Sequence, residues 1–486
     1  MKSMPDIKKE AVDWIEEHAE RMKELSNTVW LYAEPPLQEF RSSALLVGEL
    51  EASGFKVETN VADLQTAFVA TYGEGRPVLA TYAEYDATEG LSQMPVPYPC
   101  PVVQGAGGFQ DMHNGLGAGA VAGALAVKAV MEEKGFSGTL KVFGTPAEKL
   151  CVGKPYMARA GLFHGLDAVI GWHPGDKTEA EPGWGYRFLA LQGEKFIFKG
   201  TSVYGATPWE GTSALDGLAL MDIAVQYMRE HILPPDAFFT INSIISDGGQ
   251  APTNLPGRAE AWYHFRASKR EYVEKIREGM LRCAGGAALA TGTTFETEFV
   301  AATRENLPNV ALAKAMHRNI ELIGPPRITD SDKDFARQIE RKLGREPSPE
   351  PFNLSVEPPS GAIRIGAADD FTEFSWIAPT HRVYVTYSMA TSSPSWATAA
   401  FASTNIGHQS MLTAGKLIAC ALLDLFQDPS LLKEAKREFE GRTAGTRWRS
   451  LIPETQPSPK RSPLPESHYQ AMHQGCKHLP LEFISG

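Results

Sequence analysis

The sequence predicts an α/β protein with a largely parallel sheet, into which a second, smaller α/β sandwich is inserted. Three observations predict this class. At 486 residues the chain is too long for one ordinary core. Strand and helix segments alternate in its first third, which favours a parallel sheet. The pattern then changes near residue 188 and returns after residue 303. The expected division is 1–187 and 304–430 for the larger domain, 188–303 for the inserted domain, and 431–486 for a tail.

The elements of the larger domain follow from their composition. Apolar and β-branched runs bounded by turn residues predict strands, and longer runs with helical spacing predict helices. The first part reads as a helix at 39–55, strands at 67–73 and 77–87, a helix at 116–135 and a strand at 138–144. The same pattern returns with strand-bearing segments at 361–376 and 381–389 and a helix at 408–426.

The inserted segment has its own strand–helix–strand–strand–helix order. It is expected to contain a pair of strands at 188–200, a helix at 213–232, strands at 238–249 and 257–268, and a helix at 270–292. The tail contains the proline-rich stretch "PETQPSPKRSPLPES" and few core residues, so we expect it to wrap the surface.

Composition excludes several classes of partner. The formal net charge of −11 argues against a nucleic-acid partner, which rewards basic surfaces. Residues 1–22 read as a charged amphipathic helix without the apolar core of a signal peptide. The small apolar run at 115–131 is interrupted by Lys128 and is too short to span a bilayer. Five scattered cysteines without a CxxC pair suit a reducing compartment, so we expect a cytoplasmic protein without a membrane partner.

Polar residues stand where several strands should end or where a helix begins. In an open α/β sheet the loops after parallel strands share one edge, where ligands bind. Carboxylate and imidazole groups that converge there could hold a divalent cation. A single Asp–x–His stretch is weak evidence, and the joint occurrence of four stretches carries the argument. The residues concerned are Glu84, Asp86, Asp111, His113, Glu148, His173 and His408.

The order of these stretches resembles a known family. The motifs "AEYDATEGLSQ", "DMHNGLGAG", "GTPAEK", "DAVIGWHP", "DDFTEFSW" and "GHQSMLTAGKL" are similar to those of the metal-dependent aminoacylase/carboxypeptidase (M20-like) family, nearest its aminobenzoyl-glutamate hydrolase group. The likeness runs from about residue 10 to about residue 455. It implies a metallo-hydrolase catalytic domain, an inserted lid domain through which such enzymes commonly dimerise, and hydrolysis of a small-molecule amide by metal-activated water. A homodimer and a zinc or manganese ion are therefore expected.

The resemblance also implies roles for individual residues. Glu148 matches the general base, and Asp86 matches an aspartate that orients a histidine ligand. On the lid, Asn254 and Arg266 match substrate-binding positions, although Arg266 could be structural only. Tyr204 stands where relatives have a histidine that stabilises the oxyanion from the partner subunit; it could donate a hydrogen bond there or be a half-exposed aromatic residue. The implied metal ligands are Asp111, His113, His173 and His408.

Lys149 departs from the family pattern, because relatives read "AEE" where this chain reads "AEK". The second Glu normally completes one of two metal sites. An ammonium has no acceptor, and a divalent cation 4 to 8 Å away would repel it by about 4 to 8 kcal/mol at an effective dielectric constant of 20. Three interpretations remain open. One metal ion stays and Lys149 replaces the charge of the other; no metal binds and Lys149 pairs with Asp111 or Glu148; or Lys149 points outward and is inert.

The leading hypothesis is an amidohydrolase with one divalent ion per subunit, which cleaves an aryl or acyl amide such as an N-acyl amino acid or an aminobenzoyl-glutamate-like compound. Lys149 and Tyr204 would assist Glu148. The alternatives are non-hydrolytic chemistry, such as lyase, isomerase or condensation work, and a catalytically inactive binding protein. Cys151 could be a thiolate ligand but is better explained as a packing residue. Aromatic candidates near the site (Phe109, Tyr156, Trp172 and Trp209) favour a flat substrate.

Overall fold

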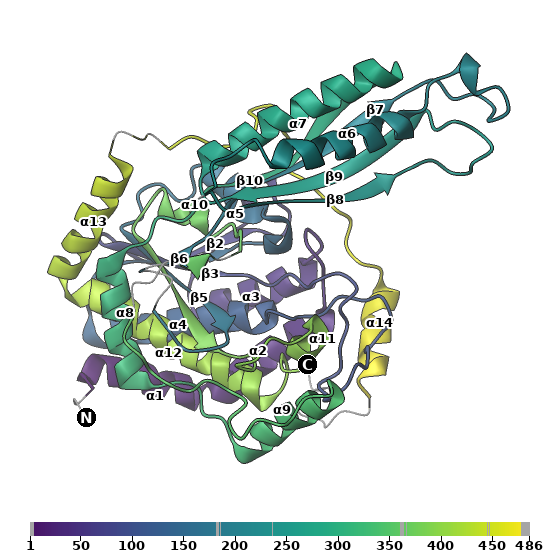
Figure 1. Ribbon diagram of the computed structural model, residues 1–486. Helices are drawn as coiled ribbons and strands as arrows, with labels where there is room; N and C mark the ends of the chain where they lie inside the picture. The colour runs from purple at the N-terminus through teal and green to yellow at the C-terminus, as the bar shows by residue number, and fades with distance from the viewer. Residues whose placement is uncertain are drawn as a thin grey trace.

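Two sheets organise the computed structural model of the chain (Figure 1). The structure describes residues 4–180, 184, 186–235, 237–359, 364–365, 367–444, 446 and 448–477. In spatial order, the larger sheet contains β1 (Lys56–Thr59), β2 (Phe68–Glu74), β4 (Gly138–Gly144), β3 (Val78–Ala83), β5 (Ala168–Gly175) and β12 (Thr380–Thr386). The last four are parallel, and β1 and β2 form an antiparallel edge. The predicted α/β class with a largely parallel sheet is confirmed.

Alternating side chains of the central strands build two cores. On β3, Leu79 and Ala83 belong to a core shared with the long helices, whereas Ala80 and Tyr82 face a second core on the other side of the sheet. The first core is formed with α1 (Asp6–Glu17), α2 (Ala19–Tyr32), α3 (Phe40–Ala52), α4 (His113–Lys134), α8 (Val310–Ile323), α9 (Asp330–Lys342), α11 (Ser395–Ala399) and α12 (Asn405–Gln427). The second core is formed with α5 (Gly153–Arg159) and α10 (Thr372–Ser375).

Helix α4 begins at His113, three residues before the predicted start, and is longer than the apolar run seen in the sequence. With 22 residues it is long enough to cross a membrane, as is the 23-residue α12, so length does not exclude a span. However, 89% of the apolar window of α4 and 78% of that of α12 are buried inside the protein. The two helices pack closely, because a Cβ at Gly123 would lie only 2.9 Å from the carbonyl oxygen of Gly415. Their apolar character is explained by this core.

The inserted segment forms a separate four-stranded sheet with two helices. In chain order its elements are β7 (Ala190–Lys199), α6 (Ala214–Arg229), β8 (Phe239–Asp247), β9 (Arg258–Ala267), α7 (Arg270–Thr291) and β10 (Thr294–Thr303), and the spatial strand order is β10-β7-β9-β8. Both helices lie on the side of this sheet that points away from the larger domain (Figure 1). The strand pair expected at 188–200 is a single strand, because β7 pairs along its whole length with β9.

The chain after α12 packs back onto the larger domain. Helix α13 (Pro429–Thr443) spans the predicted tail boundary at residue 431, and α14 (Glu466–Gly475) packs on α2. Between these helices, Ser458 Oγ donates to the carbonyl oxygen of Ala62 at 2.8 Å. Part of the expected segment 361–376 lies outside the described residues, as do the residues after 477. In the described part of that segment, the two-residue strand β11 (Arg364–Ile365) pairs with β6 (Tyr186–Arg187), and the description continues from residue 367.

Candidate active site

The Glu148–Lys149 turn follows β4 as a short 3-10 helix, Glu148–Leu150, and its backbone is held by two buried carboxylates. Ala147 has a left-handed φ of 57°, which is uncommon for a residue with a side chain. Its N–H donates to Glu39 Oε1 at 2.8 Å, and the N–H of Lys149 donates to Asp86 Oδ2 at 2.9 Å. These bonds fix the turn so that both charged side chains face the interior.

The Lys149 ammonium lies inside the cluster of predicted ligands. Its Nζ is 2.7 Å from Asp111 Oδ2, 3.0 Å from each ring nitrogen of His113 and 3.5 Å from Glu148 Oε2. The side chain is 14% exposed. Burial opposes the charge and would lower the pKa of Lys149, but Asp111, Asp86 and Glu148 outweigh it and raise that pKa. The interpretation in which Lys149 points outward is wrong.

His113 opens α4 and is held by Asp86. Its Nδ1 lies 2.7 Å from Asp86 Oδ1, so Nδ1–H donates to this carboxylate and Nε2 faces the site. Nε2 is 3.3 Å from Glu84 Oε2 and 3.7 Å from both Asp111 Oδ2 and Glu148 Oε2. Burial would lower the pKa of His113, but Asp111 and Asp86 raise it to about 9. Asp86 therefore makes the orienting contact that the resemblance implied.

The donor atoms around His113 fit a divalent ion. Asp111 Oδ1 and Glu84 Oε2 are buried and have no hydrogen-bond partner among the described residues. His173 Nδ1 lies 2.9 Å from the carbonyl oxygen of Pro174, which leaves the lone pair of Nε2 for a ligand bond. Burial, followed by Arg382, lowers the pKa of His173 to about 4, so this imidazole is already neutral, as a ligand must be. His113, whose pKa is raised to about 9, has to release a proton when it binds an ion. Glu84, His113 and His173 have ligand atoms within 4.8 Å of one another.

A layer of ion pairs lies behind these ligands, and of its members only Glu84 was assigned a role from the sequence. Lys154 is fully buried, with its Nζ 2.7 Å from Glu84 Oε1 and 2.5 Å from Asp370 Oδ1. Arg382, on β12, pairs with Asp369 at 2.5 Å. The consecutive aspartates of "DDFTEFSW" were visible as part of the family motif. The buried lysine and arginine carried no signal, because nothing in the sequence distinguishes them from surface residues.

This environment suits Glu148 for proton transfer. Burial, together with the negative charge of Asp369, raises the pKa of Glu148 well above its ordinary value, although Lys149 opposes the shift. Cys151, two residues beyond Lys149, is buried in the second core, and burial raises the pKa of its thiol well above the ordinary range. Its neutral thiol fits the packing role rather than that of a ligand.

His408 does not join this cluster in the described geometry. It lies on α12 with Nε2 2.9 Å from Asn27 Oδ1, and burial lowers its pKa to about 4, with smaller effects from Lys23 and Glu20 on α2. The groups of possible metal ligands found among the described residues do not include it. Its role as a ligand stays a prediction.

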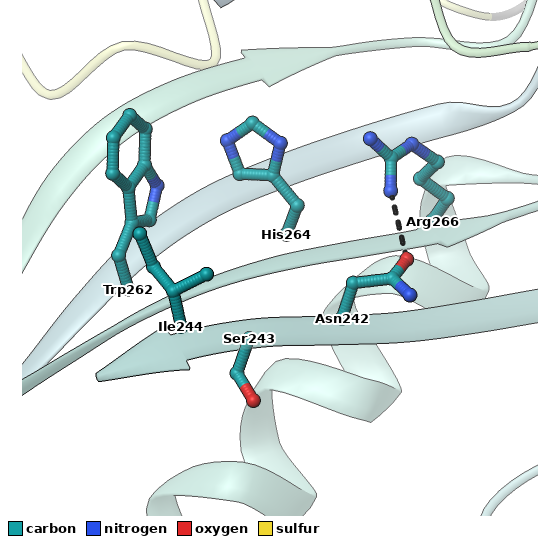
Figure 2. Close-up of a pocket in the computed structure, with 6 residues that line it drawn as sticks. All are labelled: Asn242, Ser243, Ile244, Trp262, His264 and Arg266. Carbon is teal, nitrogen blue, oxygen red and sulfur yellow. Dashed lines mark hydrogen bonds between the residues drawn. The ribbon is translucent and has the colours of Figure 1, made fainter. Parts of the chain in front are cut away.

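The lid residues lie apart from Glu148. Tyr204 is 62% exposed and forms an isolated bridge with Asn254, in segments at the outer end of the lid (Figure 1). Arg266, on β9 (Figure 2), is half-buried and pairs in register with Leu191 of β7, whose side chain belongs to the same core as Cys151. The roles of all three stay predictions.

Comparison with known proteins identifies the family. No model of a protein family matches the chain. One of the subunits of the p-aminobenzoyl-glutamate hydrolase of Escherichia coli (strain K12) is 32% identical to it, over 94% of this chain and 100% of the relative. The aminobenzoyl-glutamate utilization protein of Klebsiella pneumoniae has a similar fold, with a TM-score of 0.55, 15% identity, and coverage of 82% of this chain and 97% of that one. A dinuclear metal-binding peptidase of the M20 family from Bacillus subtilis also shares the fold, with a TM-score of 0.52, 17% identity, and coverage of 83% and 98%.

The fold and the site define a metal-dependent amidohydrolase with a catalytic domain and an inserted lid domain. The chain belongs to the aminobenzoyl-glutamate hydrolase group of the M20-like metal-dependent aminoacylase/carboxypeptidase family. The resemblance read from the motifs is therefore confirmed. Nothing in the comparisons favours the non-hydrolytic alternative.

Proposed function

We propose that this amidohydrolase cleaves an aryl or acyl amide of an amino acid, in the manner of an N-acyl amino acid or an aminobenzoyl-glutamate-like compound. The likeness to the E. coli hydrolase supports this substrate class, since it extends over 94% of the chain. The observation that carries the proposal is the position of Glu148, a buried carboxylate with a raised pKa, 3.7 Å from a histidine of the ligand cluster.

We further propose one divalent ion per subunit, zinc or manganese, held by Asp111, His113 and His173, with Glu84 as an additional oxygen ligand. When bound, such an ion supplies a Lewis acid that polarises a carbonyl group and lowers the pKa of water. Support for a single ion comes from Lys149, whose ammonium already neutralises Asp111 at 2.7 Å. A second cation at Asp111 Oδ2 would have to displace this ammonium, whereas Oδ1 has no hydrogen-bond partner among the described residues and can serve the one proposed ion.

In this proposal the other chemical roles belong to residues of the chain. Glu148 takes the proton from the attacking water on Oε2 and later returns it to the leaving amine. Asp86 holds the His113 ring in one orientation through the 2.7 Å contact with Nδ1. Lys149 keeps positive charge beside the carbonyl oxygen as it becomes negative. Asn254 and Arg266 bind the substrate from the lid.

A homodimer would complete the site. Strand β8 lies at the edge of the lid sheet. Exposed apolar residues follow one another at helical spacing on α6, and a further one lies on β8 itself. They are Leu220, Ile223, Tyr227 and Ile245. We propose that a second copy of the chain covers this surface, and that Tyr204 and Asn254, which lie at the outer end of the lid, act at the site of the partner subunit.

The test is hydrolysis of 4-aminobenzoyl-glutamate, followed by release of 4-aminobenzoate, with the metal content of the same sample measured by plasma emission. Glu148→Gln should abolish turnover and keep the metal, because it removes the base but is not among the proposed ligands. Turnover that survives in Glu148→Gln, or that survives removal of all divalent ions by a chelator, would contradict the proposal.

A further inference from the structure

The C-terminal strap, residues 449–477, has no part in the chemistry proposed for the site. It leaves the base of the lid, where the carbonyl oxygen of Arg449 accepts from Arg304 at 2.5 Å, and it ends in α14 on the larger domain (Figure 1). Between these points it is bonded to the helix that follows the catalytic turn, because Arg159 of α5 donates to the carbonyl oxygen of Gln456 at 2.7 Å. The strap is therefore anchored along its length.

Helix α14, at the end of the strap, is part of the core. Met472 and Cys476 are 2% and 0% exposed and belong to the first core. Gly475 lies against loop 84–112, which joins β3 to α4, because a Cβ at Gly475 would come within 2.7 Å of the carbonyl oxygen of Val102. Helix α14 thus packs on this loop as well as on α2.

Tyr469 joins α14 to a buried carboxylate. Its hydroxyl donates to Glu34 Oε1 at 2.6 Å, and Glu34 is 0% exposed. The guanidinium of Arg41 stacks on the Tyr469 ring, 3.6 Å from its centroid. Burial, followed by the hydrogen bond to Glu34, raises the pKa of Tyr469, so the hydroxyl keeps its proton and remains a donor.

Glu34 in turn holds two parts of the catalytic domain. Its Oε2 accepts from the backbone N–H of Ser42 at 2.8 Å and from the hydroxyl of Ser42 at 2.7 Å, and so satisfies a donor in the first turn of α3. Its backbone carbonyl oxygen accepts from the N–H of Ala87 at 2.8 Å. Ala87 is the neighbour of Asp86, so the backbone that carries Asp86 is fixed by Glu34.

The other end of loop 84–112 meets the same place. Ala33 has a left-handed φ of 45° at the end of α2. A Cβ at Gly107 would lie 2.6 Å from the carbonyl oxygen of Ala33 and 2.9 Å from the Cβ of Ala87, so the two ends of the loop touch here. Gly107 precedes Asp111 by four residues. Both Asp86 and Asp111 therefore extend from backbone that is packed on Ala33 and Glu34.

We propose that α14 supports the metal site and that Tyr469 and Glu34 are positioning residues for it. The contacts run from the Tyr469 hydroxyl to Glu34 and from the Glu34 backbone to Ala87. They continue from Asp86 to His113 Nδ1 at 2.7 Å. The inference rests on the proposed ion site and adds the element that holds its ligands in place. Loss of such support weakens metal binding although the ligands themselves are unchanged.

Tyr469→Phe tests this role, since it removes the hydroxyl and keeps the ring. The first readout is the Nδ1–H proton resonance of His113 in metal-free, full-length protein with isotope-labelled histidine, identified by its loss in His113→Gln. We expect this resonance to shift in Tyr469→Phe, because the contact with Asp86 changes. Zinc should bind about tenfold more weakly, and kcat for 4-aminobenzoyl-glutamate should fall about tenfold with KM nearly unchanged.

Tyr72→Phe is the matched control. Tyr72 also donates its hydroxyl to a carboxylate, Glu132 Oε1 at 3.0 Å, but this bond joins β2 to the last turns of α4. The control should keep the His113 resonance, the zinc affinity and the kcat of the parent. Should Tyr469→Phe fail to fold, Gly475→Ala perturbs α14 at its contact with loop 84–112. Its control is Gly441→Ala on α13, where the new Cβ has no described atom within 4 Å.

The proposal is overturned if Tyr469→Phe, or Gly475→Ala in its place, has the same His113 resonance and zinc affinity as its control. The resonance is recorded without metal or substrate, so it separates this proposal from the proposed function. If the resonance shifts as expected but the parent chain binds no ion or hydrolyses no amide, the positioning role stands and the proposed function fails.

Discussion

Removing the charge of Lys149 gives the most direct test of the one-ion proposal. Lys149→Met keeps the length of the side chain and deletes the ammonium, which leaves Asp111 without its 2.7 Å partner. At that distance and an effective dielectric constant near 20, the pair interacts by about 6 kcal/mol. Breaking a buried pair by removing one partner costs about 3–5 kcal/mol, because the remaining charge stays buried.

The free energy of unfolding should therefore fall by about 3–5 kcal/mol in Lys149→Met when divalent ions are chelated. Added zinc or manganese should restore much of it, because Asp111, His113 and Glu148 have ligand atoms within 4.8 Å of one another and the vacated space lies among them. A hundredfold excess of ion over its dissociation constant contributes roughly 2.7 kcal/mol. Turnover should fall by about 100- to 1000-fold, the usual effect of losing one oxyanion stabiliser.

Lys149→Glu completes the series, since it restores the second Glu of the family motif. We expect this variant to bind two ions per chain after dialysis, whereas the unmodified chain binds at most one. Plasma emission analysis gives the stoichiometry, and urea denaturation with and without chelator gives the stability. Two tightly bound equivalents in the unmodified chain, or full stability and turnover in chelated Lys149→Met, would refute the reasoning.

Three further predictions concern other parts of the molecule. An inactive Glu148→Gln subunit mixed with an inactive Tyr204→Phe subunit should regain activity if the lid serves the partner's site; verified heterodimers without activity would count against this. Lys154→Met should lower the free energy of unfolding by about 3–5 kcal/mol in urea denaturation, because two carboxylates lose their buried partner, and a loss under 1 kcal/mol would be inconsistent. Glu39→Ala frees the N–H of Ala147 and should reduce kcat roughly 100-fold through misplacement of the turn. Glu39→Gln should retain most activity. Thr66→Val should be a neutral control, because it removes only the hydrogen bond from Thr66 to the other oxygen of Glu39. Equal kcat values in all three variants would exclude the positioning role.

Much of the fold could be predicted because its elements carry strong local signals. The strand at 138–144 and the helix at 270–292 match β4 and α7 to within one residue, since glycine and charged residues bound each apolar run. The prediction of two strands at 188–200 is wrong because Gly193 has the local character of a turn residue. In the structure this glycine lies inside β7 and makes room for His264, a long-range reason that no local pattern contains.

The residues of the site differ in the same way, since local sequence signals predicted some of them and not others. Asp86, Asp111, His113, Glu148 and His173 stand next to strand ends or helix starts, and their motif spacing predicted that they would meet. The aromatic candidates carry no comparable local signal, and their part in binding a flat substrate stays a prediction. Phe109, Tyr156 and Trp172 are buried, with exposures of 2% or less, and Trp209 is 77% exposed.

The inner layer of charges explains why a lysine is tolerated beside a metal-ligand cluster. Glu84, Asp369 and Asp370 are all at most 5% exposed, and Lys154 and Arg382 neutralise only part of their charge. Asp86 and Glu148 add further buried carboxylates and Asp111 adds a half-buried one, so the site requires cations of some kind. An ammonium fixed to the chain meets that requirement at one position without depending on the supply of metal. The position that remains, among Glu84, His113 and His173, is the one at which we propose an ion from solution. The Lys149 series tests whether the two positions are interchangeable.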